Sequence, residues 1–89
     1  MNERDVRIAN RLGLHARAAA RFVQLANRFK ARITVTRGCA CVDGKSILGL
    51  LTLAAREGTV LKLSADGEDE VQALDELDSL VRGRFGEEG

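Results

Sequence analysis

The chain has 89 residues, of which 45% are hydrophobic and 30% charged, a composition that is typical of a folded domain and excludes a disordered one. Fourteen Lys and Arg residues balance 13 acidic ones, and there is no Trp or Tyr, which argues against nucleic acid as a ligand. Residues 1–89 are expected to form one domain with a modest core, so any chemistry is expected at its surface.

No apolar run is long enough to cross a bilayer, and the N-terminal stretch MNERDVRIAN lacks the apolar centre of a secretory signal. We therefore expect a cytoplasmic protein without a membrane partner. Cys39 and Cys41 are too close in sequence for an ordinary disulfide and have no further ligands nearby for zinc. We expect both to be small, reduced strand residues, and the sequence predicts neither a metal site nor a cofactor.

In the first half of the chain, the spacing of the apolar residues predicts three strands and a helix. Val6–Ala9 alternates apolar and polar residues, which predicts a strand. From Ala16 to Phe29 apolar residues recur every three or four positions, which predicts an amphipathic helix. The β-branched run 31–37 predicts a second strand, and 40–42 a third strand that returns in a hairpin.

The second half of the chain predicts helix, strand and helix. Ser46–Arg56 is too long and too rich in Leu and Ala for most strands and predicts a short helix, whereas 59–65 alternates as a strand does. Acidic residues at 68–70 then begin the last helix, where the helix dipole favours them. We expect residues 85–89 to form a frayed tail. In the last helix, the inner stripe of apolar residues that is predicted to face the core consists of Val71, Leu74, Leu77 and Val81.

The predicted order is therefore β-α-β-β-α-β-α. Each helix has one apolar face, so the helices are expected to cover one face of a four-stranded sheet and to leave the other face to solvent. The fold class is α+β, an open-faced two-layer sandwich. The periodicity leaves the order of the strands open.

His15 is the only histidine in the chain and stands at the predicted N-cap of the first helix. The amides of that helix's first turn have no partner inside the helix, and the helix dipole favours an anion such as phosphate there. These phosphate-binding candidates are Ala16, Arg17 and Ala18. The Arg17 guanidinium can bind two phosphate oxygens, and the positive field favours a neutral imidazole with a free lone pair. The Gly-x-His-x-Arg spacing alone is weakly specific, and a single histidine near a helix start is most often a surface cap or loop residue with no chemistry.

Two longer motifs are more specific than this spacing. Residues 13–17 (Gly-Leu-His-Ala-Arg), followed by Ala19 and Ala20, resemble the active-site signature of the histidine-containing phosphocarrier (HPr) family of the phosphoenolpyruvate-dependent phosphotransferase system. Residues 42–50 (VDGKSILGL) resemble its second signature. The resemblance extends to about Arg84 and implies an antiparallel sheet covered on one side by three helices. One departure is Ala18, where the family usually has proline.

The resemblance implies a phosphocarrier. Enzyme I, itself charged from phosphoenolpyruvate, would phosphorylate His15 on a ring nitrogen, Arg17 would hold the phosphate, and the group would pass to EIIA-type acceptor proteins. Such a protein is a covalent intermediate in a relay and not an independent catalyst. The sequence leaves open whether the relay serves sugar transport or a nitrogen-type regulatory branch.

Ser46 begins the second predicted helix, either as a structural N-cap or, as in one branch of the family, as the target of a regulatory serine kinase/phosphorylase. This helix has more apolar residues than one face can bury, which indicates an exposed docking surface. By resemblance, Enzyme I and the acceptors would contact Ile47, Leu48 and Leu51, flanked by the cationic Arg17, Arg21 and Lys45.

Two other classes of function compete with the carrier. One is a regulatory docking module of the same fold that binds a transcription factor or an enzyme through its apolar patch, and the other is a small-ligand-sensing α+β domain. Docking needs neither His15 nor Arg17, and a ligand sensor leaves the His-Ala-Arg signature unexplained. The carrier is therefore the preferred interpretation.

Overall fold

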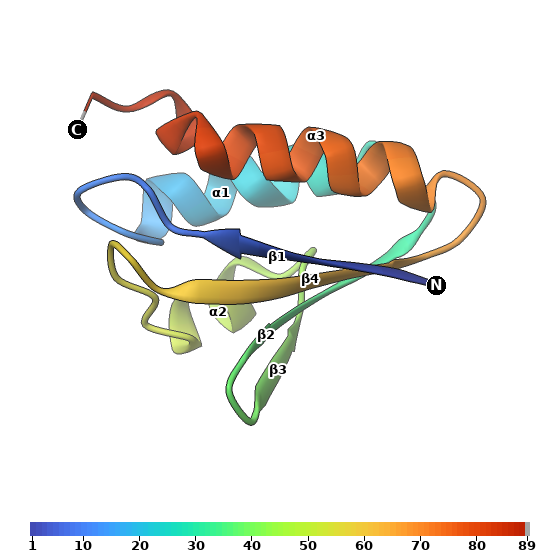
Figure 1. Cartoon of the computed structure of the whole chain (residues 1–89), viewed down its shortest axis with the longest axis horizontal. Helices are drawn as coiled ribbons and strands as arrows, with labels where there is room; N and C mark the ends of the chain where they lie inside the picture. The colour runs from blue at the N-terminus through green and yellow to red at the C-terminus, as the bar shows by residue number, and fades with distance from the viewer. Residues whose placement is uncertain (89) are drawn as a thin grey trace.

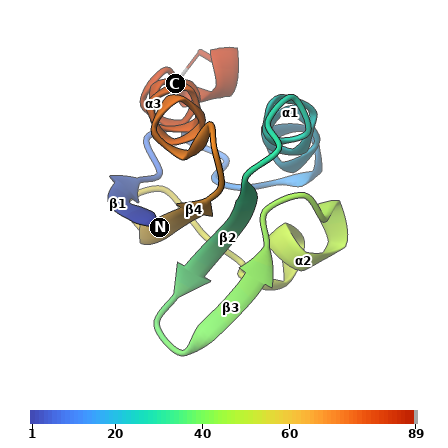
Figure 2. The ribbon, with the colours of Figure 1, turned by 90° about the vertical axis from the view of Figure 1, so that its right-hand side faces the viewer.

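The computed structural model of the chain describes residues 1–88 and consists of a four-stranded sheet with three α-helices on one face (Figures 1 and 2). The elements are β1 (Asn2–Arg7), α1 (Ala16–Ala26), β2 (Arg32–Arg37), β3 (Ala40–Asp43), α2 (Ile47–Thr52), β4 (Val60–Asp66), α3 (Glu70–Arg82) and the short 3₁₀ helix η1 (Arg84–Gly86). The predicted α+β open-faced sandwich is confirmed, and so is the predicted order of its strands and α-helices along the chain.

The strands lie in the order β1-β4-β2-β3, and each neighbouring pair is antiparallel. Val6 pairs with Leu61, and Val35 pairs with Leu63, so the apolar residues of the three longer strands face the helices together. The sequence left this order open because β4 enters the sheet between two strands that precede it in the chain. Long-range pairing decides that position, and no local pattern encodes it.

One core fills the space between the sheet and the helices. β2 and β4 contribute every second residue, β1 contributes Val6, and the helices contribute one face each, as the periods of strand and helix require. Its largest wholly buried apolar side chains are Phe85, Ile8, Ile33, Leu50, Leu63, Leu74, Leu77, Val35 and Val81.

Three elements differ in length from their predictions. β1 begins at Asn2 and not at Val6, because it pairs with β4 from its first residue onward. α1 ends at Ala26 and not at Phe29, since the amides of Arg28 and Phe29 bond to carbonyls three residues back, as in a 3₁₀ turn. α2 covers only Ile47–Thr52, because the chain turns away at Ala54, whose φ is +49°.

The predicted strand position of Cys39 is also wrong. Gly38 has a φ of +58° and starts the turn between β2 and β3, and this turn contains Cys39. Cys41 lies in β3, as expected. Both thiols are free and exposed.

The last helix begins at Glu70, later than the acidic run 68–70 suggested. Val71 is 56% exposed, so its predicted place in the inner stripe is wrong. At 3.6 residues per turn, Val71 lies about a quarter turn from the centre of the stripe. The residues of α3 that are buried are Ala73, Leu74, Leu77, Asp78 and Val81.

This difference in burial predicts unequal mutational effects on α3. Leu74 is 1% exposed, and we expect Leu74→Ala to lower the free energy of unfolding by about 2–5 kcal/mol. Val71→Ala is expected to change it by less than about 0.5 kcal/mol, as is usual for exposed positions. Urea denaturation of both variants measures the difference. Equal losses would contradict the exposed position of Val71.

Asp69 connects the start of α3 to the segment that follows α1. Its two carboxylate oxygens accept the backbone amides of Lys30 at 2.8 Å and Ala31 at 2.9 Å. The hydrogen bond from Lys30 is the largest cause that lowers the pKa of Asp69 below its ordinary value, and the hydrogen bond from Ala31 adds to it. Together they outweigh partial desolvation, which raises the pKa. The carboxylate therefore stabilises the fold in its ionised form.

We expect acid to remove this contribution. A carboxyl with a lowered pKa in the folded state contributes stability that is present above its unfolded pKa of about 3.9 and is lost as the pH falls through the folded value. Asp69→Asn should therefore melt at a lower temperature at neutral pH and lose less on acidification than the wild-type chain. Thermal unfolding followed by circular dichroism over a pH series tests this, with the exposed Glu68→Gln as the control. Parallel curves for wild type and Asp69→Asn would refute it.

Candidate functional site

The loop between β1 and α1 is held against the segment that follows α2. Gly13 has a φ of +72°, and a Cβ atom there would lie 2.5 Å from the carbonyl oxygen of Ala55, so this approach requires glycine. The amide of Leu14 then donates to the same carbonyl at 2.9 Å. The residue that follows in the chain, His15, is thereby placed beside the C-terminal end of α2.

His15 is the N-cap of α1, as predicted. Its carbonyl accepts the amide of Ala19 at 2.8 Å, and its ring Nδ1 accepts the amide of Arg17 at 3.3 Å. Within residues 1–88 the amides of Ala16 and Ala18 have no acceptor. Ala16 and Arg17 are exposed, whereas Ala18 is wholly buried. The ring nitrogen Nδ1 therefore faces the positive end of a helix.

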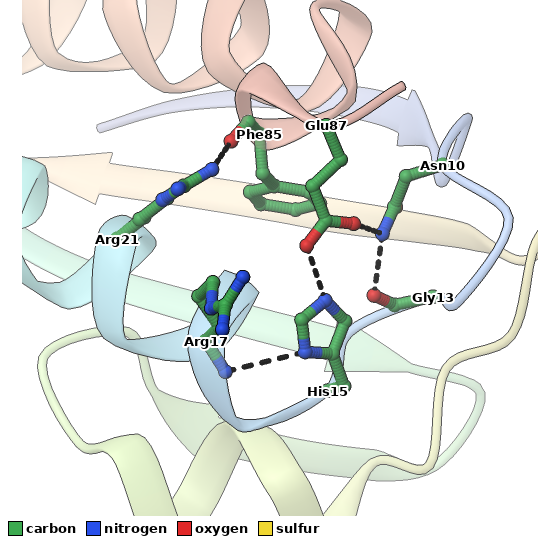
Figure 3. Close-up of polar contacts among 7 residues, drawn as sticks. All are labelled: Asn10, Gly13, His15, Arg17, Arg21, Phe85 and Glu87. Atoms are coloured by element: carbon green, nitrogen blue, oxygen red, sulfur yellow. Dashed lines mark hydrogen bonds and ion pairs between the residues drawn. The ribbon is translucent and has the colours of Figure 1, made fainter. Parts of the chain in front are cut away.

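The other ring nitrogen faces a carboxylate from the C-terminal segment (Figure 3). Nε2 of His15 lies 2.5 Å from Oε2 of Glu87, and Oε1 of Glu87 accepts Nδ2 of Asn10 at 2.9 Å. A carboxylate only accepts hydrogen bonds, and Nδ1 also acts as an acceptor in this arrangement. This pattern of partners assigns the neutral tautomer of His15 with its proton on Nε2.

Glu87 is held in its ionised form. The hydrogen bond from Asn10 is the largest cause that lowers the pKa of Glu87 below its ordinary value, and it outweighs partial desolvation. The hydrogen bond and charge of His15 lower it further, as does the charge of Arg21.

The segment that contains Glu87 is packed against the core. Phe85 is 1% exposed, and the Arg21 guanidinium donates to its carbonyl oxygen. Arg84 and Phe85 have φ values of +59° and +54°, which turn the chain back over the start of α1. Residues 85–87, which the sequence predicts to be part of a frayed tail, are thus packed against the domain through the buried Phe85 ring; Gly89 lies outside the described residues.

The basic side chains near the ring differ in what they contact. Figure 3 shows Arg17 beside the imidazole, and Arg17, Arg21 and Glu87 border one open hollow. Arg17 is exposed and makes no ion pair among residues 1–88, so its guanidinium is available to a ligand. Arg21, in contrast, is bonded to the carbonyl of Phe85.

The second motif lies along α2. Ile47 is 40% exposed, Leu48 is 77% exposed, and Leu51 is half-buried. Ser46 is the N-cap, and its hydroxyl oxygen accepts the amide of Gly49 at 3.0 Å. The structural capping role predicted for Ser46 is thus present.

Lys45 lies far from the histidine. Its ammonium donates to the carbonyl of Phe29 at 2.7 Å, just beyond the C-terminal end of α1, whereas His15 is at the N-terminal end. The start of α2 therefore lies near the C-terminal end of α1, and the segment that follows α2 adjoins the loop of His15.

Two residues of this site, Asn10 and Glu87, were not among the residues predicted from the sequence. An asparagine that follows a strand is an ordinary turn residue, and a glutamate in a tail rich in Gly and Glu gives no local signal. Only the length of the chain beyond α3 and the single apolar residue Phe85 within it could have indicated a segment that packs.

The fold and this geometry define a class: a small open-faced sandwich protein that presents one histidine at a helix N-terminus. A family model described as the PTS HPr component phosphorylation site matches residues 2–83. The phosphocarrier protein HPr of Neisseria meningitidis serogroup A is 48% identical over 87 residues, 98% of each chain, and that of Pseudomonas aeruginosa is 49% identical over 84 residues, 93% of each. The crystal structure of HPr-C-His from Thermoanaerobacter tengcongensis has a TM-score of 0.96 and 45% identity over all of both chains. The chain belongs to the HPr family of the phosphotransferase system.

Two features are absent from residues 1–88. None of the helices there has the length and apolar character needed to cross a membrane. No cluster of three or more His, Cys, Asp or Glu side chains in that range is arranged to hold a metal ion.

Proposed function

We propose that Nδ1 of His15 accepts a phosphoryl group from Enzyme I, with phosphoenolpyruvate as its source, and passes it to an EIIA-type acceptor protein. The observation that carries this proposal is the orientation of the ring. Nδ1 faces the N-terminus of α1, while Nε2 is occupied by Glu87. The names of the relatives, phosphocarrier protein HPr, support the same function.

The transfer step needs a lone pair and a place for negative charge. The lone pair of Nδ1 forms the N–P bond as the bond between phosphorus and the donor breaks, and that bonding pair leaves with the donor. The phosphoryl oxygens then carry negative charge next to the helix N-terminus, where the amides of Ala16 and Ala18 and the Arg17 guanidinium can bind them. Transfer to the acceptor is the same step in reverse, with the acceptor's nucleophile in place of the donor's.

The site suits an exchange between two large partners because it is open. The His15 side chain is 28% exposed at the end of a helix. A donor and an acceptor can reach it in turn without any movement of the core. A buried histidine would require the domain to open twice in each cycle.

Enzyme I and the acceptors would dock on α2 and the start of α1. Ile47 and Leu48 expose apolar surface that the domain does not cover, and Leu51 continues it toward His15. Arg17, which makes no ion pair among residues 1–88, can pair with an acidic partner surface. Arg21 and Lys45 add positive charge at its edges, although both contact backbone carbonyls of this chain.

Phosphorylation of Ser46 by a serine kinase remains a separate prediction. Its hydroxyl is occupied by the cap hydrogen bond from Gly49, and phosphorylation would add about two negative charges beside Ile47. Such a mark would oppose docking through this apolar surface. A pure docking module remains the alternative, but it needs no lone pair on Nδ1.

Incubation of the chain with Enzyme I and ³²P-labelled phosphoenolpyruvate tests the carrier function. We expect one label per chain that is lost in acid and survives in base, as a phosphoimidazole does. Ser46→Ala should take up the same label. A label that survives acid, or no label at all, would overturn the proposal.

The departure at Ala18 gives a milder prediction. The Ala18 amide has no acceptor within residues 1–88, so Ala18→Pro removes no hydrogen bond in the first turn, where proline is tolerated. We expect the rate of labelling to change less than tenfold and the stability to rise by about 0.4–1 kcal/mol. Initial rates and thermal unfolding measure both effects. A larger loss of rate would mean that the Ala18 amide is the main ligand of the phosphate, and that the Ala16 amide and the Arg17 guanidinium cannot replace it.

A further inference from the structure

We infer that Glu87 is a positioning residue for phosphoryl transfer: its carboxylate keeps the proton of His15 on Nε2, leaves the lone pair on Nδ1, and balances the positive charge that the ring gains with the phosphoryl group. This role rests on the proposed carrier function and extends it to the C-terminal segment. It requires a carboxylate that is itself oriented, close to the ring, and attached to a segment that stays in place.

The carboxylate of Glu87 is oriented by contacts at both of its oxygens. Oε2 lies 2.5 Å from Nε2 of His15, and Oε1 accepts Nδ2 of Asn10 at 2.9 Å. The Glu87 side chain is only 15% exposed. A surface carboxylate with one loose contact would contribute little, whereas a hydrogen-bonded one with restricted access to water interacts strongly with its partner.

Asn10 aligns the carboxylate and the histidine loop together. This residue is wholly buried, and the same Nδ2 that donates to Glu87 also donates to the carbonyl of Gly13 at 2.7 Å. Gly13 lies two residues before His15. The position of the carboxylate is therefore coupled to the loop that places the ring, as Figure 3 shows.

The C-terminal segment is anchored before any ligand arrives. The Phe85 ring is buried in the core, and Arg21 of α1 binds the Phe85 carbonyl. Two successive residues in the left-handed region, Arg84 and Phe85, direct Glu87 toward the ring. Non-glycine residues rarely adopt this backbone conformation, and where they do it is often at a functional site.

The chemical role of Glu87 follows from where the charge develops. The neutral ring has a proton on Nε2, and when Nδ1 forms the N–P bond the ring becomes cationic with that proton still in place. The carboxylate then accepts a charge-assisted hydrogen bond from Nε2–H, as the aspartate of a Ser-His-Asp triad does for its imidazolium. When the acceptor takes the phosphoryl group, the bonding pair returns to Nδ1 and the ring is neutral again. Glu87 never takes the proton.

The test compares two neighbouring carboxylates. Glu87→Gln removes the charge and keeps the shape of the side chain, and Glu88→Gln makes the same change of charge at the next, exposed residue. Two readouts are used: the initial rate of labelling by Enzyme I and phosphoenolpyruvate, and ¹⁵N–¹H NMR of the ring, which is unambiguous because the chain has one histidine.

We expect the wild-type spectrum to show a protonated, slowly exchanging Nε2 and an unprotonated Nδ1. Glu87→Gln should lose this signature and accept label about tenfold more slowly, the size of effect that is common when a residue orienting a histidine is removed. Glu88→Gln should retain both the spectrum and the rate. The wild-type spectrum needs no variant, so it tests the contact even if Glu87→Gln disturbs the fold.

Four outcomes would overturn the inference. The first is a wild-type ring without a proton held on Nε2, and the second is a Glu87→Gln chain that labels at the wild-type rate; both leave the carrier function intact. The third is a Glu88→Gln chain that loses as much labelling rate as Glu87→Gln, and the fourth is a Glu87→Gln chain that labels slowly although its ring spectrum is unchanged. Either result would mean that the carboxylates act on the docking of the partner and not on the ring. A wild-type chain that takes no label instead removes the carrier function, and the role of Glu87 with it.

Discussion

His15→Ala is expected to take up no phosphoryl group from Enzyme I and phosphoenolpyruvate while folding like the wild-type chain. The chain has no second imidazole, so no other ring nitrogen can replace the lost Nδ1. The loss should be complete, down to the background of the assay, because the substitution removes the atom that forms the N–P bond and not merely a group that assists it.

The fold should tolerate this change. The imidazole is at the surface end of α1, and its own contribution to the helix is a cap hydrogen bond to the amide of Arg17. Loss of an N-cap side chain costs about 1 kcal/mol. The melting temperature and the acid-labile label, measured on His15→Ala and on wild type together, separate a chemical defect from a folding defect. Any acid-labile label on the folded variant would contradict this prediction.

Phe85→Ala is expected to cause the second largest effect, a loss of about 3–5 kcal/mol in the free energy of unfolding. Phe85 is 1% exposed and is among the largest fully buried side chains of the domain. Small domains have a total stability of only about 5–15 kcal/mol, so this loss is a large fraction of it. The same change should release the segment that holds Glu87 against the ring.

Chemical denaturation measures the first consequence and the ¹⁵N–¹H spectrum of His15 the second. Arg84→Ala is the matched control, since Arg84 is exposed and shares the left-handed backbone of the same turn. We expect the control to change stability by less than about 0.5 kcal/mol. If the tail frays as its composition suggests, Phe85→Ala will cost no more than Arg84→Ala.

The local features of this protein could be predicted from its amino-acid sequence. The two-layer fold class followed from the periods of the apolar residues, and the place of His15 at the start of α1 followed from the position of the helical stripe. Such features depend on interactions within a few residues, where side-chain type and spacing settle which backbone hydrogen bonds form. The motif around His15, which indicated the family, is also a local feature, because its residues are neighbours in the chain.

The errors made from the sequence arose where distant segments meet. Val71 fits a helical stripe in sequence, but its exposure depends on how α3 is turned against the sheet. The hydrogen bond from the Lys45 ammonium to the Phe29 carbonyl, just beyond the C-terminal end of α1, was likewise not predicted. The spacing of residues along the chain predicts neither the exposure of Val71 nor the contact of Lys45.

The surroundings of the histidine show the same division. The sequence predicted that His15 lies at a helix N-terminus, because a residue and the helix it caps are neighbours in the chain. The sequence could not identify the group at Nε2, because Glu87 is 72 positions away from His15. Glu87 reaches the ring only when Phe85 is packed in the core. Contacts between such distant residues form when the core packs as a whole, and no short stretch of sequence specifies them.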